Sequence, residues 1–176
     1  MFLEKTYQNN IENLLTSEPF DWHYNDTTVD KSIVFPDNSS YDTVQFTHVF
    51  WYNNEPKTNK KFYSVIEPIL EKLEYTELVK VKANLLLPHT SPKQYHIPHW
   101  DIDEPGYKTL LYYVNDSDGD TLLFDKFAND EYKDLKIIHN EQPKKGNAIV
   151  FDSNRYHASN NPVNYNTRIV LNFVYR

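Results

Sequence analysis

Two spacings of the apolar residues divide this chain into an N-terminal part and a longer C-terminal part. In the N-terminal part, apolar residues recur every three or four positions, which is the period of an amphipathic helix. This spacing predicts a helix over Asn9–Thr16 and a longer one from about Asn59 to Tyr75, in which Pro68 produces a kink or takes a position that needs no backbone donor. Elsewhere in this part, Phe20–Tyr24 is expected to be extended and Tyr41–Tyr52 to form a strand.

From Glu77 onward the apolar period falls to two, the period of a half-buried strand. Turn-forming residues separate the runs, which predict strands over 78–87, 95–101, 107–114, 121–126, 134–139, 147–152 and 167–175. Helices followed by many short strands indicate an α+β fold, in which a double-stranded β-helix (jelly roll) is braced by the N-terminal helices. We expect one domain over 1–176, with a supporting part at about 1–76 and a jelly-roll core at about 77–176.

Candidate metal ligands lie in the C-terminal part. On a strand, residues at i and i+2 point to the same face, so His99 and Asp101 can grip one ion together. With His157 from a later strand, they give two imidazoles and one carboxylate, the facial triad of non-heme Fe(II) oxygenases. The alternative interpretation is a hydrogen-bonded surface pair and an unrelated loop histidine.

Arg168 follows His157 by eleven residues, inside the apolar run 167–175. A guanidinium held near a metal by a strand is a planar fork suited to a carboxylate. A metal-binding triad and an arginine that can bind a carboxylate are the groups that an iron enzyme with 2-oxoglutarate as co-substrate needs. An ordinary strand arginine paired with a carboxylate is the alternative.

Composition narrows the classes of function. The chain is 39% hydrophobic and 24% charged, which is typical of globular proteins, and no apolar run approaches the roughly 18 residues of a membrane span. It has no cysteine, which leaves His, Asp and Glu as metal ligands. The net charge of −7 argues against nucleic acid as a partner. The first residues lack a secretory signal, so a cytoplasmic location is expected, in the host if the protein is viral.

Four segments carry a resemblance to a known family: His99–Asp101, Lys108–Asn115, Gly146–His157 and Thr167–Phe173. On these segments the chain resembles the 2-oxoglutarate- and Fe(II)-dependent dioxygenases, specifically the compact prolyl-4-hydroxylase-like branch. It looks most similar to the small uncharacterised oxygenases carried by tailed phages. The resemblance covers roughly Leu78 to Arg176.

The resemblance implies that His99, Asp101 and His157 bind Fe(II) and that Arg168 binds the distal carboxylate of 2-oxoglutarate. Tyr113 falls where the resembled prolyl hydroxylases place a tyrosine that supports the same carboxylate.

Other positions bear on the co-substrate pocket. Asn84, in the middle of a predicted strand, is a candidate to face it. The chain departs from the family pattern at Leu87, where relatives often have a second co-substrate tyrosine, and at Val170, where some have Ser or Thr. Gly119–Asp120 replaces a common Gly-Gly.

The implied activity is hydroxylation of a substrate C–H bond with O2, while 2-oxoglutarate becomes succinate and CO2. A protein or peptide, prolyl in the first instance, is the leading expectation for the substrate; a free amino acid or small metabolite comes second and an alkylated base third. The alternative outside the enzymes is a jelly-roll module that binds a metal or a partner without turnover. The sequence indicates no oligomeric state.

Two segments are expected to form the mouth of the site and set its specificity: Pro88–Pro98, which contains Pro92, and the loop Ser153–Asn166 around His157. Both combine prolines with tyrosines, and neither has the run of Lys and Arg that binds a phosphate backbone. The other histidines are interpreted as structural or surface residues: His23, His48, His89, His96 and His139. Of these, only His96 is placed to line the mouth.

Overall fold

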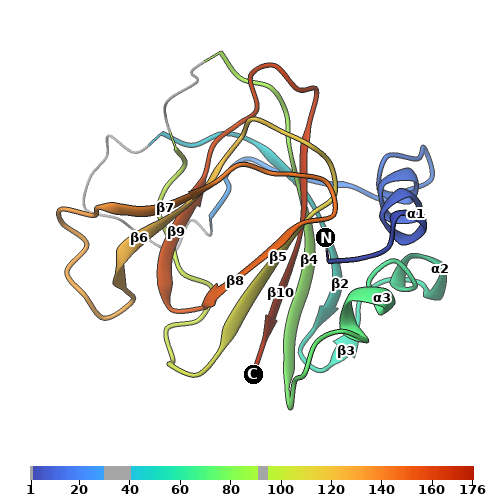
Figure 1. The fold of residues 1–176 in the computed structure, drawn as a ribbon, viewed down its shortest axis with the longest axis horizontal. Helices are drawn as coiled ribbons and strands as arrows, with labels where there is room; N and C mark the ends of the chain where they lie inside the picture. The colour runs from blue at the N-terminus through green and yellow to red at the C-terminus, as the bar shows by residue number, and fades with distance from the viewer. Residues whose placement is uncertain (1, 30–40, 91–94) are drawn as a thin grey trace.

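The computed structural model describes residues 2–29, 41–90 and 95–176. Within these residues, the strands form two antiparallel sheets (Figure 1). The large sheet has seven strands in the order β1-β2-β4-β10-β5-β8, with β3 paired to β2, and the small sheet has the order β7-β6-β9. Two antiparallel sheets fit the expected jelly roll.

The strands have the following bounds: β1 His23–Asn25, β2 Gln45–Tyr52, β3 Glu55–Pro56, β4 Leu78–Leu86, β5 Lys108–Tyr113, β6 Thr121–Phe127, β7 Ile137–Glu141, β8 Ala148–Asp152, β9 Arg155–Ser159 and β10 Arg168–Tyr175. The helices are α1 Lys5–Leu15, α2 Lys60–Tyr63 and α3 Glu67–Leu70.

The three helices cover one side of the large sheet, as Figure 1 shows. Helix α1 turns Gln8, Ile11 and Leu15 inward, at the three- and four-residue spacing that a single buried face requires. The main hydrophobic core lies between the helices and this sheet. Because α2 and α3 have only four residues each, the helical bracing is modest.

Strand β10 is buried along its whole length. It pairs with β4 over Arg168–Tyr175 and with β5 over Val170–Tyr175, so it lies inside the sheet. Its apolar side chains Ile169, Leu171 and Phe173 join the main core. The alternate side chains project to the opposite face of the sheet, toward the small sheet, and among them are Arg168 and Asn172.

Most predicted strands of the C-terminal part are present within a few residues of their predicted bounds. The prediction was wrong at 95–101, where His99 forms an isolated bridge and no strand develops. Pro98 lacks a backbone N–H and restricts Ile97, so a regular ladder cannot run through this segment. The assignment of Ser153–Asn166 to a loop was also wrong, because β9 lies inside it and pairs with β6.

The single helix predicted over Asn59–Tyr75 is two short helices. The side chain of Asn59 caps α2 by accepting a hydrogen bond from Phe62 N at 3.1 Å. Pro68 lies in the first turn of α3, where a backbone N–H has no partner within the helix, so the missing N–H of proline costs nothing. In a helix interior, a proline would also clash with the carbonyl four residues earlier. Among the described residues no helix has the length and apolar character of a membrane span.

Replacing Phe173 with Ala should lower the free energy of unfolding by about 3–5 kcal/mol, since it leaves a cavity in place of a fully buried ring. Urea unfolding followed by circular dichroism measures this. Val150→Ala is the control, because Val150 is 53% exposed on β8 and its truncation should cost less than about 1 kcal/mol. Equal losses in the two variants would contradict the placement of the core.

Candidate active site

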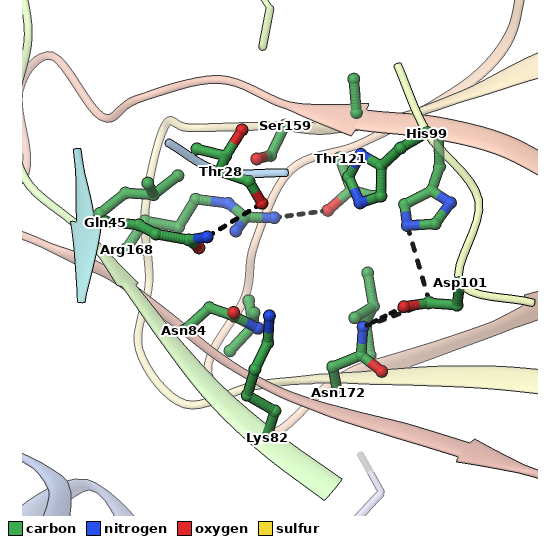
Figure 2. A pocket seen from close by; sticks show the side chains of 15 residues that line it. Thr28, Gln45, Lys82, Asn84, His99, Asp101, Thr121, Ser159, Arg168 and Asn172 are labelled. Carbon is green, nitrogen blue, oxygen red and sulfur yellow. Dashed lines mark hydrogen bonds and ion pairs between the residues drawn. The ribbon is translucent and has the colours of Figure 1, made fainter. Parts of the chain in front are cut away.

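One pocket lies between the two sheets (Figure 2). The large sheet contributes Gln45, Lys82, Asn84, Leu86, Leu111, Arg168, Val170 and Asn172, and the small sheet contributes Thr121, His157, Ala158 and Ser159. Thr28, His99 and Asp101 complete the lining. The polar face of β10 therefore meets the candidate metal ligands inside a single cavity.

His99 and His157 are held side by side by their backbones. His99 N donates to His157 O at 2.9 Å, and His157 N donates to His99 O at 2.8 Å. Directly opposed residues of an antiparallel pair project to the same side, and the two ring centroids are 4.4 Å apart. The sequence placed His99 on a strand, but in the structure a single isolated β-bridge to His157 is enough to bring the two rings together.

Asp101 is tied to the turn between β8 and β9, because its N–H donates to Ser153 O at 2.9 Å. Its buried carboxylate accepts hydrogen bonds from Lys80 Nζ at 2.8 Å and from Thr109 Oγ1 at 2.8 Å. Asn172 Nδ2 lies 3.3 Å from Asp101 Oδ2, and His157 Nε2 lies 3.8 Å from the same oxygen. The structure therefore brings His99, Asp101 and His157 together.

The electrostatics favour the protonation states that metal ligands need. Burial lowers the pKa of both histidines, that of His99 to about 3, so both rings are neutral at pH 7. Burial alone would raise the pKa of Asp101, but the nearby charge of Lys80 opposes it most strongly, and that pKa lies below its usual range. The carboxylate is therefore ionised.

The donor set fits Fe(II) by residue type and by ring orientation. The Nδ1 of His99 lies 3.1 Å from Ile97 O, and the Nδ1 of His157 lies 3.0 Å from Arg155 O. A ring nitrogen that donates to a carbonyl leaves the other nitrogen with its lone pair free for a metal. Across 2–29, 41–90 and 95–176, however, no three acidic, cysteine or histidine side chains already form a group that could hold an ion as they stand.

Arg168 lies across the pocket from these side chains (Figure 2) and is 3% exposed. Its Nε donates to Gly119 O at 2.6 Å, and its Nη2 donates to Thr121 Oγ1 at 2.7 Å. Both acceptors are neutral, and a guanidinium has five N–H donors, so the charge and several donors stay available to a ligand. A Cβ on Gly119 would lie 2.6 Å from Asn160 O and 2.9 Å from Arg168 Cδ, so this turn fits only glycine.

Tyr113 and Asn84 have different places. The hydroxyl of Tyr113 donates to Thr121 Oγ1 at 2.9 Å, the oxygen that also receives Arg168. Tyr113 is therefore connected to Arg168 through Thr121, and it is not part of the pocket lining. Asn84 does line the pocket. Of the departures from the family pattern, Val170 lines the pocket and Leu87 is exposed.

Sequence reasoning missed the partners of Asp101 and the second lysine of β4. Lys80, Lys82 and Asn84 alternate with apolar residues, a pattern that normally describes a strand with one solvent face. Here that face points into the pocket. Thr109 and Asn172 also gave no signal, because each sits inside an apolar run.

The predicted mouth segments are only partly present in the pocket. Residues 91–94, Pro92 among them, lie outside the described residues. From Ser153–Asn166 the pocket takes His157, Ala158 and Ser159, all on β9. His96 is buried with its Nε2 2.8 Å from Asn161 Oδ1 and is not among the residues that line the pocket, so the expectation that it lines the mouth was wrong.

No protein-family model and no curated protein matches this sequence. Solved structures with the same fold exist. AviO1 from Streptomyces viridochromogenes is 11% identical with a TM-score of 0.59, and the match covers 99% of this chain and 86% of AviO1. A 2OG-Fe(II) oxygenase family oxidoreductase from Burkholderia pseudomallei is 12% identical with a TM-score of 0.58, covering 98% and 80%.

A third structure is SnoN, a non-heme alpha-ketoglutarate-dependent epimerase from nogalamycin biosynthesis. It is 11% identical with a TM-score of 0.57, and the match covers 99% of this chain and 75% of SnoN. At these identities the likeness shows the fold alone: this chain has the same fold as these three solved structures.

Lys80→Met should lower the free energy of unfolding by about 3–5 kcal/mol at pH 7, because it leaves the buried Asp101 charge unpaired. Urea unfolding measures the loss, and Lys80→Met combined with Asp101→Asn should recover part of it. Lys108→Met is the matched control, since its pair with Asp152 is exposed and should contribute about 0–1 kcal/mol.

The same pair sets a pH dependence. Because the folded-state pKa of Asp101 is lowered, its contribution to stability is full above the ordinary carboxyl pKa of about 3.9 and declines as the pH falls below that value. A double variant as unstable as Lys80→Met alone would contradict the ion pair.

Proposed function

We propose that this protein is an Fe(II)- and 2-oxoglutarate-dependent dioxygenase that hydroxylates a C–H bond of its substrate. One observation carries the proposal: a cluster of two neutral histidines and an ionised aspartate faces a buried arginine with free donors across a single pocket. The likeness in fold to a protein of the 2OG-Fe(II) oxygenase family and to an alpha-ketoglutarate-dependent epimerase supports it.

His99 and His157 would bind the iron through Nε2, and Asp101 through Oδ2. When bound, Fe(II) would use O2 and 2-oxoglutarate to oxidise the substrate, releasing succinate and CO2. Lys80 donates to Oδ1 of Asp101 and Thr109 donates to Oδ2, so the orientation of this carboxylate does not depend on the metal.

Arg168 would bind the distal carboxylate of 2-oxoglutarate with the N–H groups that Gly119 and Thr121 leave free. Thr121 fixes the plane of the guanidinium, and Tyr113 fixes Thr121. The apolar side chains of Leu86, Leu111 and Val170 exclude water from part of the wall and so strengthen this contact.

The substrate class is a further proposal. A peptide, prolyl in the first instance, or a small polar molecule suits a pocket lined by amides, hydroxyls and cations. The prolyl-4-hydroxylase-like branch and the likeness to phage oxygenases rest on the sequence motifs alone. A module that binds a partner without turnover is separated from an enzyme by one assay, the formation of succinate dependent on both Fe(II) and 2-oxoglutarate.

His157→Ala should abolish stoichiometric binding of Fe(II), or of Mn(II) used in its place, since it removes one of three ligands. Elemental analysis of the protein after gel filtration measures occupancy. His139→Ala is the matched control, because His139 is exposed on β7 and should leave binding unchanged. Full occupancy in His157→Ala would refute the ligand set.

Arg168→Ala should weaken 2-oxoglutarate binding at least tenfold while leaving metal binding intact, because a charge-assisted contact of about 1.5–3 kcal/mol is lost. Calorimetry with Mn(II)-loaded protein measures both affinities. Arg176→Ala is the control, since Arg176 is exposed at the chain end. Unchanged 2-oxoglutarate affinity in Arg168→Ala would rule out this role for the arginine.

A further inference from the structure

Lys82 is a cation that points into the pocket from β4 (Figure 2). Its neighbour on the same face, Lys80, is paired with Asp101 at 2.8 Å. Lys82 itself makes no hydrogen bond or ion pair with any residue in the part of the chain that the structure describes. Burial and the charge of Lys80 lower the pKa of Lys82 to about 8, so it is still largely protonated at pH 7.

An unpaired cation that is partly buried, as Lys82 is, costs free energy, and folds normally avoid it. The opposed residue on β10, Asn172, does not relieve the cost, because its amide nitrogen donates toward Asp101. The amide oxygen of Asn172 is buried and also has no partner among the described residues. The pocket therefore holds a donor and an acceptor that the fold leaves unused.

The charges of the pocket point to an anion. Lys80 and Asp101 offset each other, which leaves the positive charges of Lys82 and Arg168. Fe(II) and the two carboxylates of 2-oxoglutarate would also offset each other. The loaded site would then still carry an excess positive charge beside Lys82, and a further anionic group would neutralise it.

Lys82 is also placed for contact with a second ligand. It lines the inner pocket together with Arg168 and His99, and it lines an adjoining outer cavity together with Gln45 and the segment Asn25–Val29. Thr28 and Gln45 belong to both cavities as well. A molecule entering from the outer cavity would meet Lys82 before it reached the candidate metal ligands.

We propose that Lys82 binds a carboxylate of the primary substrate and so selects for acidic substrates. This inference rests on the proposed function, and it deepens it: the substrate is a molecule with a free carboxylate, in addition to the 2-oxoglutarate held by Arg168. That carboxylate can belong to a free amino acid or to an acidic residue of a peptide, and the test separates the two.

The test is calorimetry on Mn(II)-loaded protein saturated with 2-oxoglutarate, which reads binding without turnover. The probes are the free L-amino acids, their carboxamides, and N-acetylated, C-amidated tripeptides with a central Asp, Glu, Asn or Gln. We expect at least one acid to bind tenfold or more tightly than its own amide. Binding of free acids alone identifies a small-molecule substrate, and binding of Asp or Glu tripeptides identifies a peptide.

Lys82→Met removes the charge and keeps the length of the side chain. It should reduce the preference for acid over amide to less than twofold and leave 2-oxoglutarate affinity within twofold of the wild type. Lys82→Arg should retain most of the preference. Lys136→Met removes an exposed charge and should change nothing. Because Lys82→Met takes away an unpaired cation, the variant should fold with a thermal midpoint no lower than the wild type.

Three results would overturn the inference: no probe preferred as the acid by the wild type, an unchanged preference in Lys82→Met, or a loss of 2-oxoglutarate affinity in Lys82→Met as large as in Arg168→Ala. The last would assign Lys82 to the co-substrate. A separate succinate assay with Fe(II) and O2 reports on the proposed function. If no succinate forms while acid binding still depends on Lys82, the oxygenase assignment fails and the carboxylate site stands.

Discussion

The two backbone hydrogen bonds between His99 and His157 are the interaction on which the site depends. They attach a segment with little regular structure to β9 and set two imidazoles beside each other. From that point the chain needs only two more residues to bring Asp101 to the same place, where Ser153 O and Lys80 hold it. The contacts of the Asp101 carboxylate therefore depend on the backbone bridge between His99 and His157.

Strand β10 joins the stability of the fold to the chemistry of the pocket. Its apolar side chains fill the main core, while Arg168, Val170 and Asn172 line the pocket on the other face. A shift of its register by one residue would exchange the two sets, placing a guanidinium in the core and a phenyl ring in the pocket. The burial that stabilises the sheet therefore also fixes the position of the arginine.

Sequence reasoning located the strands that pack on both faces and the residues with strong local patterns. Strands β4 and β10 were predicted within one residue at each end, because β4 alternates apolar and polar residues and β10 is a long run rich in β-branched and aromatic residues. The grouping of His99, Asp101, His157 and Arg168 around one cavity was also expected from their spacing, while their roles stay predictions.

Features that depend on distant residues were not visible in the sequence. His157 was expected on a strand, but the bounds of β9 were not predicted, because its apolar residues are few and its pairing partner β6 lies some thirty residues earlier in the chain. Lys80 and Lys82 were not singled out, since no local signal in the sequence says what covers the polar face of a strand. Pro68 was expected to produce a kink or to take a position that needs no backbone donor, and it takes such a position at the start of α3; the division into two single-turn helices was not predicted.

The close approach at Gly119 has a consequence for how this site can change over generations. Its carbonyl receives Arg168 Nε, and a side chain there would meet Asn160 O and Arg168 Cδ at once. Substituting the glycine disturbs the arginine, and shortening the arginine removes the donor that occupies the glycine carbonyl. The two positions are therefore physically coupled, and a tolerated change at one of them requires an accommodating change at the other.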